Sequence, residues 1–224
     1  DELLLQRVVR VVGEAVGPVV VVAADGQAVP PLPGNVEVVR DAVPNRGPLE
    51  GLLAGLNALD GRVDAVYLSA CDMPFLKLGF VRRVVECLLL PPPGRGEGGG
   101  GGRLAGEPTP HPNPPPQGGR EQEAAPGENS FLPLIAVPRV GGRRHPLAAA
   151  YRVSVREEAV KLLATRRAGP VHLFDAVPTR YLGPEAFADV DPACESLKNV
   201  NTPDEYHTAL ERLATTSQPQ HPAT

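Results

Sequence analysis

The chain has 224 residues, of which 42% are hydrophobic, so it can bury the core of one α/β domain with appendages. Its formal net charge is −4 and no basic stripe is visible, which argues against a nucleic-acid partner. No run approaches about 18 consecutive apolar residues and no signal-peptide pattern is present, so we expect no membrane span. Three cysteines without metal-ligand spacing predict reduced thiols in a cytoplasmic protein: Cys71, Cys87 and Cys194.

Proline and glycine are too frequent for a compact domain, at 27 and 24 residues. Residues 91–130 hold 10 of these prolines and 11 of these glycines. Leu104 is the only aliphatic residue beyond alanine in this segment, which therefore cannot bury enough apolar surface to offset its ordering entropy. We predict a disordered surface insertion; docking of its HPNPPP stretch as a polyproline II ligand is the alternative.

Helices and strands are predicted to alternate before the insertion, as in a parallel sheet. Apolar residues recur at the helical period over residues 3–16, and Gly17 and Pro18 end this helix. The chain enters this helix at once, so we expect a fragment or a start site set too far downstream. The other predicted elements of this part are strands at 19–24, 36–41 and 66–70 and helices at 48–59 and 78–90.

The predicted elements after the insertion are strands at 131–137 and 146–153, helices at 154–166 and 171–176, strands at 179–182 and 197–201, and a helix at 203–214. The first two strands are joined by a short glycine-containing turn, which is typical of an antiparallel hairpin. Thr202 and Glu205 have capping-box spacing before the last helix, and Pro203 suits its first position. We therefore expect a doubly wound, mostly parallel α/β sheet with a small antiparallel hairpin, and a frayed tail at 215–224.

Asp72 follows the apolar strand at residues 66–70, in the stretch VDAVYLSACDMPFL. That strand is predicted to be buried on both faces of a parallel sheet, and Pro74 ends its pairing. The carboxyl ends of such strands form the crevice where ligands bind, and a carboxylate there can hold Mg²⁺ together with substrate phosphates. The alternative is that Asp72 only caps the following helix.

Gly51 and Gly55 lie four residues apart, on one face of the helix at 48–59. Each glycine costs roughly 1 kcal/mol relative to alanine in a helix interior. We therefore expect a ligand or an adjacent strand to approach that face, and packing is the more common reason.

Several motifs in order resemble the molybdenum cofactor guanylyltransferases, a family of Rossmann-like nucleotidyltransferases. They are Asp41 followed by GPLEGLLAG, then YLSACDMP, GGRRHPLAAAY and NVNTPDE. The resemblance implies transfer of GMP from GTP to molybdopterin or its molybdenum-loaded form, with release of pyrophosphate. It makes residues 1–90 the nucleotide-binding half and residues 131–214 the acceptor-binding half of one domain. A molybdoenzyme or its chaperone is a further candidate partner.

The resemblance also implies roles for particular residues. Asp72 would coordinate Mg²⁺, and Asn199 and Asn201 would line the reacting end of the pocket. The nucleotide would lie along Asp41, Gly47, Pro48 and Leu49, and the acceptor near His145 and Pro146. Asparagine amides can donate to phosphate without adding charge, or share a metal through their oxygens. His145 could equally be a hydrogen-bonded loop histidine, and Asn199 a local cap.

The family also has a first strand and a glycine-rich loop, G-G-x-S-x-R-M-G followed by D-K, which these 224 residues do not contain. Backbone N–H groups of such a loop cradle phosphates, and its missing strand would lie beside the strand at 66–70. We therefore expect this chain to bind GTP weakly and to turn over poorly. The alternatives are a cytidylyl- or sugar-phosphate-specific nucleotidyltransferase and a non-catalytic binding module.

Overall fold

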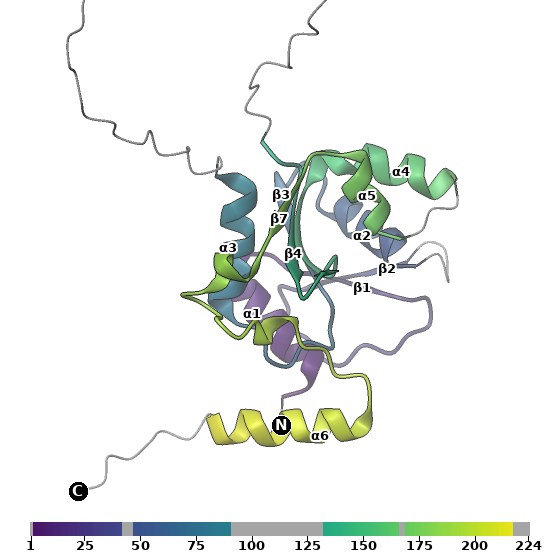
Figure 1. Ribbon diagram of the computed structural model, residues 1–224. Helices are drawn as coiled ribbons and strands as arrows, with labels where there is room; N and C mark the ends of the chain where they lie inside the picture. The colour runs from purple at the N-terminus through teal and green to yellow at the C-terminus, as the bar shows by residue number, and fades with distance from the viewer. Residues whose placement is uncertain (1, 42–46, 91–131, 166–168, 217–224) are drawn as a thin grey trace, which may run out of the picture.

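The structure is a computed structural model that describes residues 2–41, 47–90, 132–165 and 169–216 (Figure 1). Its strands are β1 (Val20–Ala23), β2 (Glu37–Arg40), β3 (Ala65–Ser69), β4 (Ile135–Val140), β5 (Arg143–Arg144), β6 (Ala148–Arg152) and β7 (Thr179–Leu182). Its α-helices are α1 (Leu4–Val16), α2 (Pro48–Ala58), α3 (Leu78–Leu89), α4 (Arg156–Ala164), α5 (Val171–Ala176) and α6 (Pro203–Thr216). Three short 3-10 helices are η1 (Val153–Val155), η2 (Pro184–Phe187) and η3 (Glu195–Leu197). The predicted insertion at 91–130 lies wholly outside the described residues, and so does the predicted tail apart from residues 215 and 216, which end α6.

The expected α/β architecture with an antiparallel hairpin is confirmed. β1 pairs with β2 and β4 pairs with β7, both in parallel. β6 lies between β3 and β4 and is antiparallel to both, so it forms the second arm of the hairpin. The small strand β5 folds back onto β4 in the intervening turn.

Helices cover both faces of these strands (Figure 1). α1 and α3 lie on one side, and α2, α4 and α5 on the other. Residues alternate along β6 accordingly: Ala148 and Ala150 join the core with α1 and α3, whereas Ala149 and Tyr151 join the core with α2 and α4. Both cores are apolar, which makes this a three-layer α/β/α domain.

Two sequence-based expectations need correction. β3 pairs antiparallel with β6, rather than within a parallel ladder, in the part of the chain that the structure describes. Residues 197–201 do not form the expected strand but follow the 3-10 turn η3 as irregular backbone. The physical reason is that N–H groups of this stretch are used locally. Those of Leu197 and Lys198 donate to the backbone oxygens of Cys194 and Glu195, and that of Asn201 donates to Oε2 of Glu205 in the cap of α6.

The helix face that carries Gly51 and Gly55 packs against strand β1. An added Cβ at either glycine would meet only the side chain of Val22, at 3.9 and 3.6 Å respectively. The adjacent strand β1 therefore faces both glycines as expected, but it leaves room for a Cβ, so packing does not require glycine at either position.

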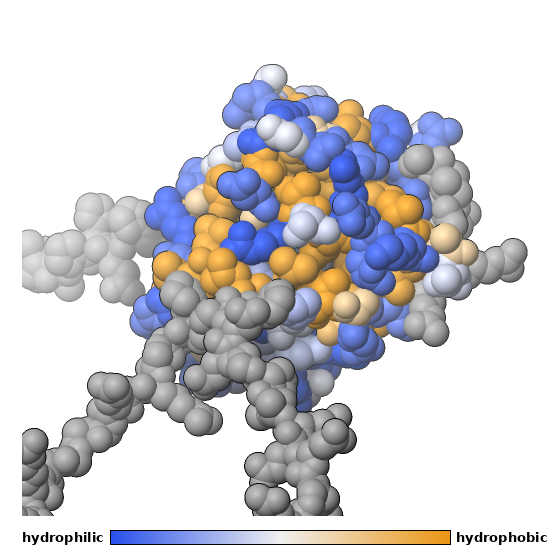
Figure 2. Space-filling model, turned by 90° about the horizontal axis from the view of Figure 1, so that it is seen from above, coloured by the Kyte–Doolittle hydropathy of each residue, from blue (hydrophilic) through white to orange (hydrophobic). Residues whose placement is uncertain are grey.

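No helix in the described segments is both long and apolar enough to span a membrane. Figure 2 shows one face of the molecule, on which hydrophobic side chains are interspersed with hydrophilic ones.

Candidate active site

Asp72 lies just beyond the carboxyl end of β3 and is half-buried. Both its backbone and its side chain contact a segment from the far end of the chain. The N–H of Val200 donates to the backbone oxygen of Asp72 at 3.0 Å, and Nδ2 of Asn199 donates to its Oδ1 at 2.9 Å. Oδ2 has no hydrogen-bond partner among the described residues, so one carboxylate oxygen is oriented and the other can take a ligand.

The cap of α6 holds Asn201 beside this contact. Oε2 of Glu205 accepts the N–H groups of Asn201 and Thr202, at 2.7 and 3.2 Å. The N–H of Glu205 in turn donates to Oγ1 of Thr202 at 3.2 Å, which completes the expected capping box. The side chain of Asn201 is exposed and lines a cavity.

A cavity of about 940 Å³ lies between β1 and β3; we call it the strand-gap cavity. Consecutive residues 19–24 and 63–72 line it, although successive side chains of a strand point to opposite faces. The facing backbone edges of both strands therefore border the cavity. No ladder joins β1 to β3 in the described chain.

Four of the residues predicted to contact the nucleotide share the strand-gap cavity: Asp41, Gly47, Pro48 and Asp72. Gly47 adopts a φ of 81°, a left-handed conformation that favours glycine at the start of α2. Leu49 differs, because its side chain is fully buried in the core beneath α2. Leu49 could therefore offer a nucleotide only its backbone.

A second cavity of about 860 Å³, the α6 cavity, contains the residues predicted on the acceptor side. His145, Pro146, Asn199 and Asn201 all line it. Leu147 lines both cavities, and the Asp72–Asn199 hydrogen bond joins a residue of one to a residue of the other. The two cavities therefore adjoin at Asp72.

A hydrogen bond from β6 holds the loop that carries His145 and Pro146. The hydroxyl of Tyr151, a fully buried side chain, donates to the backbone oxygen of Pro146 at 2.7 Å. The N–H of His145 donates to the oxygen of Pro138 at 3.0 Å, but its imidazole has no hydrogen bond to any described residue. Burial, and secondarily the positive charge of Arg143, lowers the pKa of His145. The imidazole is therefore neutral at neutral pH.

Four cationic side chains line the α6 cavity, and the sequence analysis did not single out any of them. Lys198 and Arg212 are paired with Glu195, and Arg144 approaches Asp175 at 3.8 Å. Arg143 forms no ion pair within the described residues, so its charge is available to an anion in the cavity. The adjacent arginines in GGRRHP, directly before His145, were the available signal.

Mg²⁺ fits this site as a shared ligand, and no closed protein cage is present. The described residues contain no group of three or more His, Cys, Asp or Glu side chains that could hold a metal. Mg²⁺ is commonly held by one or two carboxylates together with substrate phosphates. Asp72 has an unpartnered oxygen beside the strand-gap cavity, and Asp41 lines the same cavity, so this donor set suits Mg²⁺ bound with a nucleotide.

Comparisons with known proteins confirm the resemblance seen in the sequence. The family described as the MobA-like NTP transferase domain matches residues 1–97. A probable molybdenum cofactor guanylyltransferase of Chloroflexus aggregans is 27% identical over 214 residues, covering 96% of this chain and 82% of the relative. One of Mycobacterium tuberculosis (strain H37Rv) is 37% identical over 100 residues, covering 41% of this chain and 49% of the relative. The match thus spans about half the length of the mycobacterial relatives.

One solved structure is titled molybdopterin-guanine dinucleotide biosynthesis protein A from Archaeoglobus fulgidus. It is 19% identical, covers 80% of this chain and 69% of its own, and has a TM-score of 0.48. Over these stretches the chain is similar in sequence to proteins named probable molybdenum cofactor guanylyltransferase and to the MobA-like NTP transferase domain.

Proposed function

We propose that this relative of the MobA-like NTP transferases acts in transfer of GMP from GTP to the terminal phosphate of molybdopterin or of its molybdenum-loaded form. An oxygen of the acceptor phosphate forms a bond to the α-phosphorus of GTP. The bond between that phosphorus and the bridging oxygen to the β-phosphate breaks, and pyrophosphate leaves. The product is the guanine dinucleotide form of the cofactor.

The observation that carries this proposal is the junction of the two cavities at Asp72 and Asn199. A transferase with two substrates needs two adjoining sites and a polar group where they meet. Asp41, Gly47 and Pro48, which line the strand-gap cavity together with Asp72, suit the nucleotide, and Arg143 and His145, which line the α6 cavity, suit an anionic acceptor.

The chemistry asks the protein mainly to position phosphates and to offset their charge. Asp72 would hold Mg²⁺, which when bound would neutralise charge on the phosphates. Nδ2 of Asn199 keeps the carboxylate of Asp72 oriented. Arg143 attracts the acceptor phosphate, and the neutral imidazole of His145 supplies a hydrogen bond without adding charge.

A thermal-shift ranking of GTP, CTP and ATP with Mg²⁺ tests the nucleotide preference. We expect GTP to give the largest shift, measured on this chain and on a version extended upstream through the family's glycine-rich loop. Because residues 1–224 contain no such loop, we expect a much smaller shift for the chain alone. CTP in first place would favour the cytidylyl-specific alternative.

Transfer of label from the α-phosphate of GTP to molybdopterin tests the reaction itself. We expect Mg²⁺-dependent transfer by the extended version. Binding of GTP without any transfer would favour the non-catalytic binding module instead. We also propose a cytoplasmic location, because three cysteines without metal-ligand spacing are typical of reduced thiols.

A further inference from the structure

Asp191 is a fully buried carboxylate that lines neither cavity and belongs to none of the motifs in the sequence. Its Oδ1 accepts hydrogen bonds from Nζ of Lys77 at 2.7 Å and from the N–H of Glu195 at 3.1 Å. Its Oδ2 accepts the N–H of Ser196 at 2.8 Å. Burying an isolated carboxylate is costly, so these partners must be kept in place for Asp191 to remain buried and charged.

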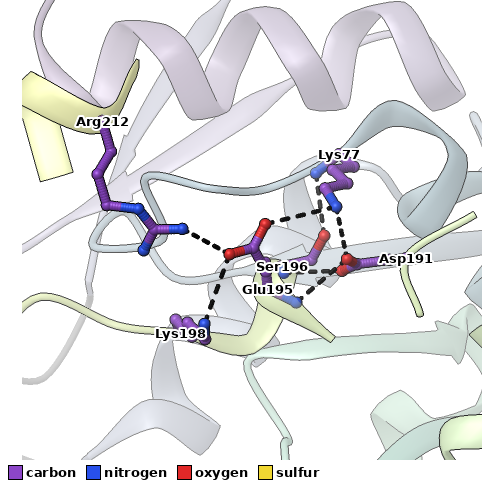
Figure 3. Close-up of polar contacts among 6 residues, drawn as sticks. All are labelled: Lys77, Asp191, Glu195, Ser196, Lys198 and Arg212. Carbon is purple, nitrogen blue, oxygen red and sulfur yellow. Dashed lines mark hydrogen bonds and ion pairs between the residues drawn. The ribbon is translucent and has the colours of Figure 1, made fainter. Parts of the chain in front are cut away.

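Lys77 is tied to this turn by its backbone as well as by its side chain (Figure 3). Its N–H donates to Oγ of Ser196 at 3.1 Å, while its ammonium contacts Asp191. Lys77 lies five residues after Asp72, and Ser196 lies three residues before Asn199. These contacts therefore join the segment that carries Asp72 to the segment that carries Asn199. The bond between Lys77 and Ser196 does so within five residues of either side chain.

Glu195 extends the same network towards α6 (Figure 3). Its carboxylate contacts Arg212 at 2.6 Å, Lys198 at 3.5 Å and Lys77 at 3.7 Å. The guanidinium of Arg212 also stacks over the ring of Phe75, with 4.3 Å between its Cζ and the ring centroid. These outer contacts are partly exposed and therefore weaker than those of Asp191. Asp191 is the buried centre of the network.

We propose that Asp191 is a positioning residue, which holds the turn η3 so that Asn199 meets Asp72 and keeps the candidate metal-binding carboxylate oriented. This role rests on the proposed function, since it concerns the same site. Asp191 acts through Ser196 and Lys77 and contacts no substrate. Groups that orient a metal ligand from outside commonly change metal affinity when they are altered.

The test compares Asp191→Asn with the matched control Asp189→Asn. In the first variant the NH₂ group of the new amide would face a donor from which Asp191 now accepts a hydrogen bond. A buried polar group would then be left without a partner. Asp189 lies two residues away, where it pairs with Arg83 at the surface, outside the network. Both changes remove one carboxylate charge, but only the first removes the centre of the network.

Two measurements decide the outcome. Hydrogen exchange of the Val200 amide reports its bond to Asp72, relative to amides of β6 as an internal reference. Binding of Mn²⁺ alone, followed by electron paramagnetic resonance, reports the metal site. For Asp191→Asn we expect about tenfold faster relative exchange at Val200 and about tenfold weaker Mn²⁺ binding. For Asp189→Asn we expect no change in either.

Lys77→Met and Ser196→Ala keep the proposal testable if Asp191→Asn does not fold. Each removes one partner of the network, so we expect smaller changes in the same two measurements. Unchanged exchange at Val200 and unchanged Mn²⁺ affinity in the folded variants would overturn the proposal, whatever their melting temperatures. If the unaltered chain binds no Mn²⁺ alone, the measurement is repeated with GTP present, because the site shares its metal with nucleotide phosphates. No Mn²⁺ binding by the protein there either would mean that the metal site of the proposed function is wrong, and exchange at Val200 alone then decides the role of Asp191.

Discussion

Nδ2 of Asn199 donates a hydrogen bond of 2.9 Å to Oδ1 of Asp72, joining residues that lie 127 positions apart in the sequence. The adjacent backbone bond from Val200 to the oxygen of Asp72 makes this a two-point contact. The carboxylate is therefore oriented before any ligand arrives. Preorganised polar groups of this kind cost no rearrangement during reaction.

Asp72→Ala should abolish most Mg²⁺-dependent nucleotide transfer in the version extended upstream. Loss of one electrostatic group at a phosphoryl-transfer site typically lowers the rate by about 10² to 10³. Folding should be little affected, because Asp72 is half-buried and its backbone bond to Val200 remains. Steady-state rates and thermal melting of both proteins check this.

Asp60→Ala is the control for that experiment. Asp60 is an exposed carboxylate that pairs with Arg156 and lines neither cavity. Its removal should leave the transfer rate unchanged. Formation of the dinucleotide product at an undiminished rate by Asp72→Ala would show that the carboxylate does not serve the reaction.

Local patterns in the sequence predicted most of the helices and strands. The helical period gave α1, the β-branched run gave β1, and the spacing of Thr202 and Glu205 gave the cap of α6. Each of these signals lies within a few neighbouring residues. The boundaries at 171–176 and 179–182 match α5 and β7, because glycine and proline bracket these elements.

Contacts between distant segments could not be predicted from such patterns. The position of Asp72 after an apolar strand indicated a ligand site, whereas Asn199 was placed there only through the family resemblance. Nothing local indicated that the two side chains share a hydrogen bond. The strand expected at 197–201 was wrong because its N–H groups bond within the preceding turn and to the cap of α6, and the turn is stabilised by the buried Asp191, which lies outside every motif. The antiparallel pairing of β3 with β6 was also missed, because β6 lies beyond the insertion and no local pattern indicates which strands pair.

Gly55→Ala should stabilise the protein by about 0.4–1 kcal/mol, because alanine restricts the unfolded chain and favours a helix interior. An added Cβ would meet the side chain of Val22 at 3.6 Å, which is an ordinary contact distance. The free energy of unfolding from urea denaturation checks this. Destabilisation would show that α2 and β1 pack more closely than the structure describes.

Gly61→Ala is the comparison variant for Gly55→Ala, and we expect the opposite effect on stability. Gly61 has open space around it, but its φ is 68°, a conformation that costs a residue with a Cβ about 1–2 kcal/mol. We therefore expect destabilisation there. Equal effects at Gly55 and Gly61 would contradict the assignment of backbone conformation as the deciding factor.

Thr202→Ala should loosen the start of α6. It removes the oxygen that accepts the N–H of Glu205, and loss of such a cap costs about 1 kcal/mol. α6 buries little apolar surface, with only Ala209 fully buried among its described side chains, so packing cannot compensate. Hydrogen exchange of the first-turn amides should accelerate, whereas Thr215→Ala at the other end should leave them unchanged. Equal exchange in both variants would contradict the capping role.

His145 should make stability depend on pH in the mildly acidic range. Its pKa is lowered on folding, chiefly by burial and then by Arg143, so the unfolded chain binds a proton more readily than the folded one. The contribution is therefore fully present above the unfolded pKa of about 6.5, and stability falls as the pH drops from there towards the folded pKa. Below the folded pKa the effect levels off, because both states are then protonated.

His145→Gln should remove this part of the pH dependence, and urea denaturation of both proteins between about pH 5 and pH 8 measures it. Arg143→Gln should raise the pKa of His145 only partly, as followed by the NMR signals of the imidazole, because burial is the larger cause. A full return to the ordinary histidine value in Arg143→Gln would mean that charge repulsion, and not burial, keeps the imidazole neutral. Arg143 would then control the protonation of His145.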